Sequence, residues 1–334
     1  MTTLRARIVE RIRADGPLTF AEYMDAALFD PTDGFYARGP LIGSGGQFAT
    51  AAMAHPAFAD AIAREAEATW EQLGRPDRFR VTEAGPGSGG LARRVADRLA
   101  ERSVPHELVL VERSAGLRER QREALAGVPA AWVDAPADLE PAPGFLYANE
   151  LLDALPVRVL AWPDEVRVDV DEDGRLVEAL APADPALVAL LPPDLALRTG
   201  GRYAVRPGMI ALVAALAASV DRGRLAVIDY GGTGVEVHDG RRNPVRTYIG
   251  GQPGGDPLQA PGTQDITADV DFGALDAAAA ACGLEVEPLA TQAAWLRGHG
   301  WEAPPADRRD EEGWALAGLL DERLPFMVWR ACRG

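Results

Sequence analysis

The chain of 334 residues contains no lysine, so all 34 of its basic residues are arginines. Acidic residues number 50, and the formal net charge is −16. Proteins that bind nucleic acid usually carry a basic footprint, so this balance argues against a nucleic acid as partner. We expect the acidic excess to serve solubility instead.

Cysteine is almost absent, since only Cys282 and Cys332 occur. Two cysteines cannot form a disulfide framework, and no closely spaced group of cysteines and histidines offers metal-ligand spacing. We therefore expect reduced thiols and no metal site.

Long apolar runs are also missing, because none reaches the roughly 20 residues that span a bilayer. The segment Met1 to Asp15 alternates charged and single apolar residues, so it lacks the apolar core of a signal peptide. The sequence thus predicts a cytoplasmic protein without a membrane partner. Its hydrophobic fraction of 47% suits one large or two smaller globular domains.

Glycine, in contrast, is concentrated between an apolar strand pattern and a helix pattern, in Glu83-Ala84-Gly85-Pro86-Gly87-Ser88-Gly89-Gly90. Such a turn lets the backbone approach a ligand closely, and the helix that follows offers unpaired N–H groups. The predicted cradle residues are Gly85, Pro86, Gly87 and Gly89. The spacing of the glycines also satisfies the dinucleotide pattern G-x-G-x-x-G, so NAD stays an alternative.

The acidic residue at position 83 favours one of these two ligands. A carboxylate at the strand end would repel a pyrophosphate but attract S-adenosylmethionine (SAM), which carries an ammonium and a sulfonium and no phosphate. Glu112 follows the apolar run 107–111 and lies 22 residues after Gly90, where an acid can accept hydrogen bonds from a ribose. The sequence therefore favours SAM.

Further polar residues follow the next two strands predicted along the chain. We expect Asp134 to contact the adenine amine, and Asn149 and Glu150 to lie near the reacting methyl group. The carboxyl ends of parallel strands meet at one edge of a sheet, so these side chains are predicted to gather there. Glu150 is the candidate base or orienting carboxylate, and Asp153 a further orienting group.

Strand patterns alternate with helix patterns of about ten residues, which predicts an α/β fold with a Rossmann-like parallel sheet. Period-two segments between Val157 and Leu180 predict an inserted antiparallel meander. Thr19 and Glu22 have the spacing of a capping box at a helix start. The predicted parts are an N-terminal helical cap (1–56), a SAM-binding half (57–156), an inserted β subdomain (157–205) and a C-terminal half (206–334) with a loop insertion (231–265).

Several segments together resemble the MidA-like class I SAM-dependent methyltransferases, a family that includes the mitochondrial complex I assembly-factor arginine methyltransferase. The resemblance rests on residues 18–24, 33–36, 83–89, 111–114, 148–156, 228–231 and 261–272. It implies a seven-stranded methyltransferase sheet, SAM as methyl donor and, in some members, a protein arginine as acceptor. It also adds Tyr36, Thr50 and Arg113 to the expected cofactor residues.

One segment departs from the family pattern Gly-Asp-Phe-x-Thr-Ser-Pro-Glu. Gln47 stands in place of the acid and Met53 in place of the glutamate. A guanidinium acceptor needs carboxylates that hold its charge, so the departure leaves the acceptor open between a protein and a small molecule, and between nitrogen and oxygen. A SAM-binding assembly factor without catalysis is the alternative function, an NAD(P)-dependent oxidoreductase a weaker one, and a homodimer the oligomeric state considered.

Overall fold

The computed structural model of the chain describes residues 3–37, 55–305 and 310–334. The chain divides into two compact units. We call them the antiparallel unit (Met1–Pro40, Leu152–Ala211 and Gly231–Leu275) and the parallel-sheet unit (Leu41–Leu151, Leu212–Tyr230 and Asp276–Gly334). Each is assembled from three separate stretches of sequence, so neither corresponds to one continuous segment.

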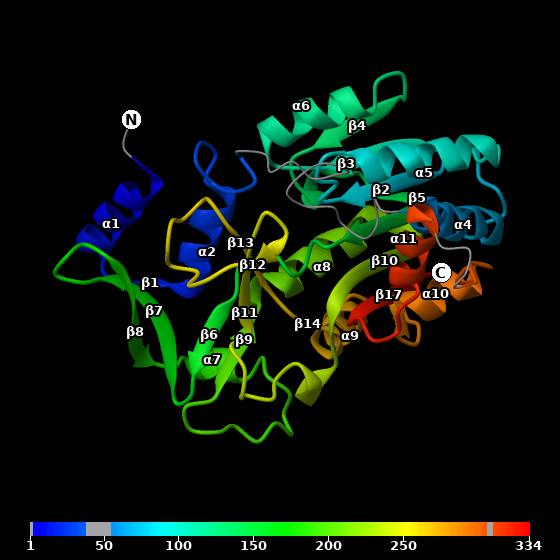
Figure 1. Cartoon of the computed structure of the whole chain (residues 1–334). Helices are drawn as coiled ribbons and strands as arrows, with labels where there is room; N and C mark the ends of the chain where they lie inside the picture. The colour runs from blue at the N-terminus through cyan, green and yellow to red at the C-terminus, as the bar shows by residue number, and fades with distance from the viewer. Residues whose placement is uncertain (1–2, 38–54, 306–309) are drawn as a thin grey trace. The chain divides into compact units, whose positions relative to one another are not determined.

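One large sheet forms the centre of the parallel-sheet unit. Its strands are β2 (Arg80–Ala84), β3 (Glu107–Val111), β4 (Ala130–Val133), β5 (Ala142–Asn149), β10 (Val220–Gly232), β15 (Glu285–Val286), β16 (Ala290–Thr291) and β17 (Phe326–Arg333). Their order is β15-β17-β10-β5-β2-β3-β4, with β16 beside β17. The six strands from β17 to β4 are labelled in Figure 1. The strands from β4 to β10 pair in parallel, and β17 is antiparallel to its neighbours.

This arrangement confirms the predicted α/β, Rossmann-like sheet. Seven strands lie on the continuous path, and in the described part of the chain β16 and β14 (Val270–Asp271) pair beside it, so the sheet has nine strands in all. The parallel pairing brings the carboxyl ends of β2, β3, β4 and β5 to one edge. The predicted ligand residues Glu83 and Asn149 lie at the ends of β2 and β5, and Glu112, Asp134 and Glu150 directly follow β3, β4 and β5.

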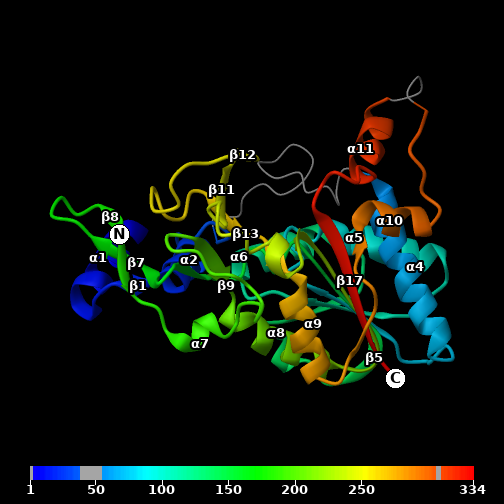
Figure 2. The ribbon, with the colours of Figure 1, turned by 90° about the horizontal axis from the view of Figure 1, so that it is seen from below.

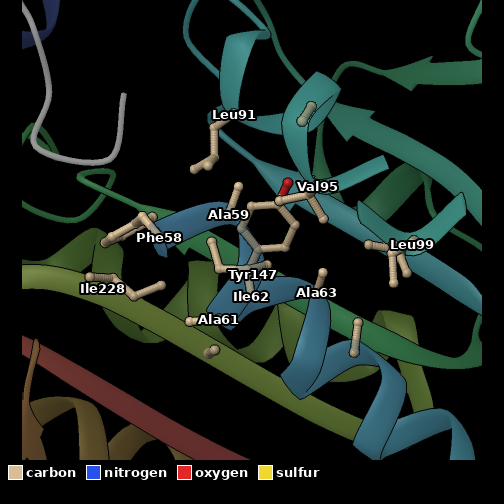
Figure 3. Packing of buried hydrophobic residues seen from close by; sticks show 14 of the residues in the cluster. Phe58, Ala59, Ala61, Ile62, Ala63, Leu91, Val95, Leu99, Tyr147 and Ile228 are labelled. Atoms are coloured by element: carbon tan, nitrogen blue, oxygen red, sulfur yellow. The ribbon is translucent and has the colours of Figure 1, made fainter. Parts of the chain in front are cut away.

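Helices cover this sheet and build its core. They are α4 (Pro56–Gln72), α5 (Gly90–Glu101), α6 (Ala115–Ala124), α8 (Pro207–Ser219), α9 (Phe272–Ala281), α10 (Gln292–Gly298) and α11 (Glu311–Leu319), with a short 3₁₀ turn at Pro136–Asp138. Figure 2 shows α4, α5 and α10 together on one side of β17. The fully buried Tyr147 of β5 lies among apolar side chains of α4 and α5, which include Phe58, Ile62, Leu91, Val95 and Leu99 (Figure 3).

A buried ion-pair cluster also stabilises this unit. Glu65 of α4 is 3% exposed and accepts hydrogen bonds from Arg224 Nη1 at 2.6 Å and Arg330 Nη1 at 2.8 Å. Trp295 Nε1 donates a third bond at 3.1 Å. Burial by itself raises the pKa of Glu65, yet the hydrogen bonds from His299 and Trp295 and the two arginine charges lower it well below its usual range. Glu65 is therefore an ionised carboxylate inside the fold.

The antiparallel unit contains two small sheets. One comprises β1 (Leu18–Thr19), β7 (Asp164–Val170), β6 (Arg158–Ala161) and β9 (Arg202–Val205), with β8 (Leu176–Pro182) beside β7; the other comprises β12 (Gln252–Pro253), β11 (Val245–Ile249) and β13 (Asp265–Ala268). Its helices are α1 (Leu4–Asp15), α2 (Phe20–Phe29), α7 (Pro185–Val188) and a 3₁₀ turn at Gly234–Glu236. The strands β6, β7 and β8 confirm the predicted meander.

The capping box predicted at the start of α2 is confirmed. Thr19 Oγ1 accepts a hydrogen bond from the Glu22 backbone N–H at 3.1 Å, and the Glu22 carboxylate accepts one from the Thr19 N–H at 2.8 Å. This reciprocal capping box satisfies two backbone donors that a helix start leaves open.

One predicted element is corrected. The insertion predicted as a loop over 231–265 contains β11 and β12, because Val245 and Thr247 alternate inward with outward residues and β11 pairs with β13. The many glycines of this segment hid the two strands in the sequence.

Candidate cofactor and acceptor residues

The glycine turn links the end of β2 to the start of α5. Gly85, Gly87 and Gly89 have φ values of 69°, 53° and 82°, in the left-handed region that residues with a Cβ rarely adopt. The Gly85 N–H binds the Val111 carbonyl at 3.1 Å, which fixes the turn to the end of β3. A Cβ on Gly89 would lie 3.0 Å from the Gln121 Cα, so α6 packs directly against the turn. All four predicted cradle residues, Pro86 included, thus belong to one fixed loop.

Glu83 lies near the end of β2, and its side chain is 2% exposed. The Tyr147 hydroxyl donates to Oε2 at 2.9 Å, and the Ala92 backbone N–H also donates to the carboxyl group. Burial raises the pKa of Glu83 to about 8, although both hydrogen bonds lower it. These bonds join β2, β5 and the first turn of α5, and the predicted contact of Glu83 with the cofactor stays a prediction.

Glu112 lies just after β3 and is 8% exposed. Its Oε1 accepts a hydrogen bond from the Ser114 N–H at 2.7 Å, and its Oε2 accepts one from Gln121 Nε2 at 3.2 Å. A carboxylate has about four acceptor positions, so these two bonds leave capacity on each oxygen. Burial raises the pKa of Glu112, which the two hydrogen bonds counteract. The group fits a ligand that offers two neighbouring hydroxyls, as a ribose does.

Gln121 is a residue that the sequence reasoning missed. It is fully buried, donates to the Gly87 carbonyl at 2.9 Å as well as to Glu112, and accepts a bond from Trp132 Nε1 at 2.9 Å. A signal was present, because Gln121 falls four residues after Leu117, on the inward face of α6.

Asp134 and Arg113 lie more openly at the same edge. The Asp134 side chain is 74% exposed and forms an ion pair with Arg118. Arg118 Nε also donates to the Glu112 carbonyl at 2.6 Å, which ties the ends of β3 and β4 together. Arg113 is exposed. The structure thus gathers Asp134 near Glu112 through Arg118, and the predicted adenine contact stays a prediction.

Asn149 is the last residue of β5, and Glu150 follows it at this edge. Glu150 has a φ of 49°, an uncommon value for a residue with a side chain, and its N–H binds the Ile228 carbonyl at 2.8 Å. Asn149 Nδ2 lies 3.4 Å from Glu150 Oε1. The backbone bond to β10 holds Glu150 in this conformation, as is common for residues at functional sites.

Tyr36 and Asp153 belong to the antiparallel unit, and both influence the carboxyl group of Asp265, Tyr36 by a hydrogen bond and Asp153 by its charge. The Tyr36 hydroxyl donates to Asp265 Oδ1 at 3.0 Å. Burial, and then the charge of Asp153, raise the pKa of Asp265 to about 7. Sequence reasoning did not select Asp265, although it lies in a segment that carries the family resemblance. Thr50, Gln47 and Met53 lie outside the described residues.

In residues 3–37, 55–305 and 310–334, no group of three or more His, Cys, Asp or Glu side chains could hold a metal ion. No helix within the described chain is long and apolar enough to cross a bilayer.

Comparisons with known proteins address the ligand. Residues 61–289 match the sequence model of a family described as S-adenosyl-L-methionine-dependent methyltransferases. The mitochondrial protein arginine methyltransferase NDUFAF7 of Danio rerio is 27% identical over 325 residues, which cover 88% of this chain and 75% of that protein. The Bos taurus protein of the same name is 29% identical over 308 residues, covering 81% and 68%.

A solved structure agrees with these sequence matches. The crystal structure of a Burkholderia thailandensis protein bound to S-adenosylhomocysteine is 28% identical, with a TM-score of 0.89 over 99% of this chain and 92% of that one. Of the two ligands weighed from the sequence, SAM is therefore supported and NAD is not. The predicted family, enzyme class and cofactor are confirmed: the chain belongs to the MidA-like family of class I SAM-dependent methyltransferases.

Proposed function

We propose that the chain binds SAM at the turn formed by Gly85, Pro86, Gly87 and Gly89 and transfers its methyl group to a nitrogen acceptor, with a protein arginine as the favoured substrate. Glu112 accepts hydrogen bonds from the ribose hydroxyls. The observation that carries the proposal is Glu112 itself, a buried carboxylate with unused acceptor capacity beside a fixed glycine loop. The remaining cofactor residues proposed are Glu83, Arg113, Asp134, Asn149, Tyr36 and Thr50.

SAM supplies an activated methyl group when it is bound. The chain's own residues then contribute position and exclusion of water, which are the main sources of rate in such a transfer. The glycine turn brings backbone N–H groups close to the ligand, because no Cβ intervenes. Asn149, Glu150 and Asp153 are the proposed groups that orient the acceptor.

The arginine acceptor is supported by two observations. The relatives from Danio rerio and Bos taurus are named as protein arginine methyltransferases. A guanidinium is positively charged and needs a carboxylate as its partner, which Glu150 just after β5 offers. Glu150 is the proposed carboxylate that holds the guanidinium, since a charge-assisted pair would retain it in one orientation.

A transfer assay with a radiolabelled methyl group tests the acceptor. Purified chain is incubated with labelled SAM and an arginine-rich peptide, and with a matched peptide that has lysine at every arginine position. We expect label on the first peptide, stable to alkali as an N-methyl group is. Label lost in alkali would indicate an oxygen acceptor, and label on neither peptide would contradict a protein arginine.

Glu150→Gln tests the proposed role of the residue. We expect it to abolish transfer while the SAM affinity, measured by calorimetry, stays within about threefold of the parent, because the change removes a charge near the acceptor. Glu172→Gln, at an exposed turn of the antiparallel unit, is the matched control and should transfer normally. Unchanged transfer in Glu150→Gln would remove Glu150 from the mechanism. SAM binding without transfer in the parent chain would favour a binding-only assembly factor.

The cytoplasmic location and the homodimer stay predictions of their own. The mitochondrial location named for the relatives is theirs. Cell fractionation and light scattering of the purified chain would test them.

A further inference from the structure

We propose that Gln121 is a positioning residue for ribose recognition, which holds the Glu112 carboxylate and the glycine turn at one fixed separation. This inference rests on the proposed role of Glu112. Its basis is a single buried amide that contacts both parts of the cofactor site. No position in the family resemblance includes Gln121.

The Gln121 amide is fully satisfied by three groups from three parts of the chain. Nε2 donates to the Gly87 carbonyl at 2.9 Å and to Glu112 Oε2 at 3.2 Å, and Oε1 accepts from Trp132 Nε1 at 2.9 Å. An indole N–H can only donate, so Trp132 fixes which end of the amide carries the oxygen. Both N–H groups of Gln121 must therefore face the cofactor site.

The other Glu112 oxygen is held from the same helix. Ser114 is the N-cap residue of α6, and its N–H donates to Glu112 Oε1 at 2.7 Å. The start of α6 and its second turn thus fix both carboxylate oxygens. Because α6 also packs on Gly89, one rigid element sets the distance between the acid and the turn.

The amide also affects the charge of Glu112. Burial raises the pKa of that carboxyl group, and the hydrogen bond from Gln121 lowers it again. Without the amide, Glu112 would take up a proton at higher pH and lose acceptor strength. Ribose binding would then weaken at the acid end of the pH range.

The test compares nucleosides that differ in one hydroxyl. Affinities for adenosine, 2′-deoxyadenosine and 3′-deoxyadenosine are measured by calorimetry on the whole chain, as the parent and as Gln121→Met, which keeps the side-chain length and removes the donors. A hydrogen bond to a charged group is worth enough for the parent to prefer adenosine about tenfold or more. We expect Gln121→Met to reduce this preference to about twofold and to move the acid limb of adenosine binding to higher pH.

Gln292→Met is the matched control, since Gln292 is also a buried glutamine of the parallel-sheet unit, and donates to the Leu319 carbonyl at 3.1 Å. It should lower stability without altering nucleoside preference. If Gln121→Met does not fold, Trp132→Phe removes only the bond that orients the amide, and an intermediate loss of preference is expected. If Gln121→Met or Trp132→Phe lowers the affinity for all three nucleosides by the same factor, the inference is overturned. Gln121 then only stabilises the turn.

Glu112→Gln separates this inference from the proposed cofactor site. If Glu112→Gln keeps the full preference for adenosine, Glu112 does not read the ribose and both proposals are contradicted. If Glu112→Gln loses the preference while Gln121→Met retains it, the site is supported and the role of Gln121 alone is overturned.

Discussion

Two regions of the parallel-sheet unit each bury a glutamate, and they treat it in opposite ways. Glu65 is 3% exposed among two arginines, a tryptophan and a histidine, and the pKa of Glu65 is well below its usual range. Glu83 is 2% exposed beside a tyrosine hydroxyl and a backbone N–H, and its pKa is about 8. Equal burial thus gives an anion in one region and a neutral acid in the other, because only the first has cations nearby.

The two glutamates differ in what surrounds the carboxyl group. Two arginine charges and two hydrogen-bond donors lower the pKa of Glu65, whereas Glu83 has two hydrogen-bond donors and no cation that offsets its burial. Identifying a carboxyl group at a strand end is therefore not sufficient to infer a negative charge. The charged groups around the carboxyl group decide it.

The largest expected effect tests the charged region. Glu65→Gln removes the buried one of the two carboxylates that Arg224 and Arg330 share, while the second, Glu287, stays paired with both arginines. Breaking a buried pair in this way costs about 4 kcal/mol. Urea unfolding measures it. Glu107→Gln, which removes the exposed partner of Arg78, should change the free energy of unfolding by less than about 0.5 kcal/mol. A loss below about 1 kcal/mol in Glu65→Gln would show that the cluster is not a stabilising centre.

At Glu83, we predict that removing the ionisable group increases the free energy of unfolding. The folded state keeps the proton of Glu83 up to about pH 8, while the unfolded chain releases it near 4.5. The unfolding free energy of the parent should therefore fall as the pH rises from about 5 to about 8. Glu83→Gln imitates the neutral acid, so it should be more stable than the parent by about 4 kcal/mol at pH 8 and by about 1 kcal/mol at pH 5. A less stable variant at pH 8 would mean that Glu83 is ionised in the fold.

Two glycine substitutions test how closely α6 packs on the glycine turn. Gly89→Ala adds a Cβ to a residue with a φ of 82° and places it 3.0 Å from the Gln121 Cα. Gly127→Ala has the same backbone strain, with a φ of 83°, but nothing within 4 Å of the new atom. We expect a stability loss of about 2 kcal/mol for Gly89→Ala and about 1 kcal/mol for Gly127→Ala, measured by urea unfolding. Equal losses would argue against close packing of α6 on the turn.

The smallest effect concerns the hydroxyl that Glu83 accepts from. Tyr147→Phe should cost about 1 kcal/mol, and because the lost hydrogen bond lowered the pKa of Glu83, that pKa should rise above 8. Carbon NMR of the Glu83 carboxyl group measures this change. Tyr23→Phe, which removes a buried hydroxyl that donates to the Pro257 carbonyl, is the control and should leave the titration of Glu83 unchanged. A fall in the pKa would contradict the hydrogen bond.

Periodicity and spacing were sufficient for much of the fold. Apolar runs before Glu112 and Asn149 gave the central strands, and the glycines at 85, 87 and 89 gave the turn, because local backbone demands are written into neighbouring residues. The capping box of Thr19 and Glu22 is local in the same way.

Contacts between distant segments could not be read in this way. The position of Glu83 at a strand end was clear from the sequence, whereas its hydrogen-bond partner Tyr147, 64 residues later, was not. Gln121 appeared as one more polar residue in a helix until Gly87, Glu112 and Trp132 were placed around it. The strands β1 and β9 are short, and each pairs with a strand that is distant in the sequence, β7 and β6 respectively. Their own residues therefore did not indicate a strand.

The most direct test of ribose binding by Glu112 is a crystal structure of the chain grown with S-adenosylhomocysteine. We predict that the adenosine lies beside the ends of β2 and β3, with both ribose hydroxyls within about 3.2 Å of the Glu112 carboxylate oxygens. A nucleoside bound elsewhere, or a ribose that does not contact Glu112, would contradict it.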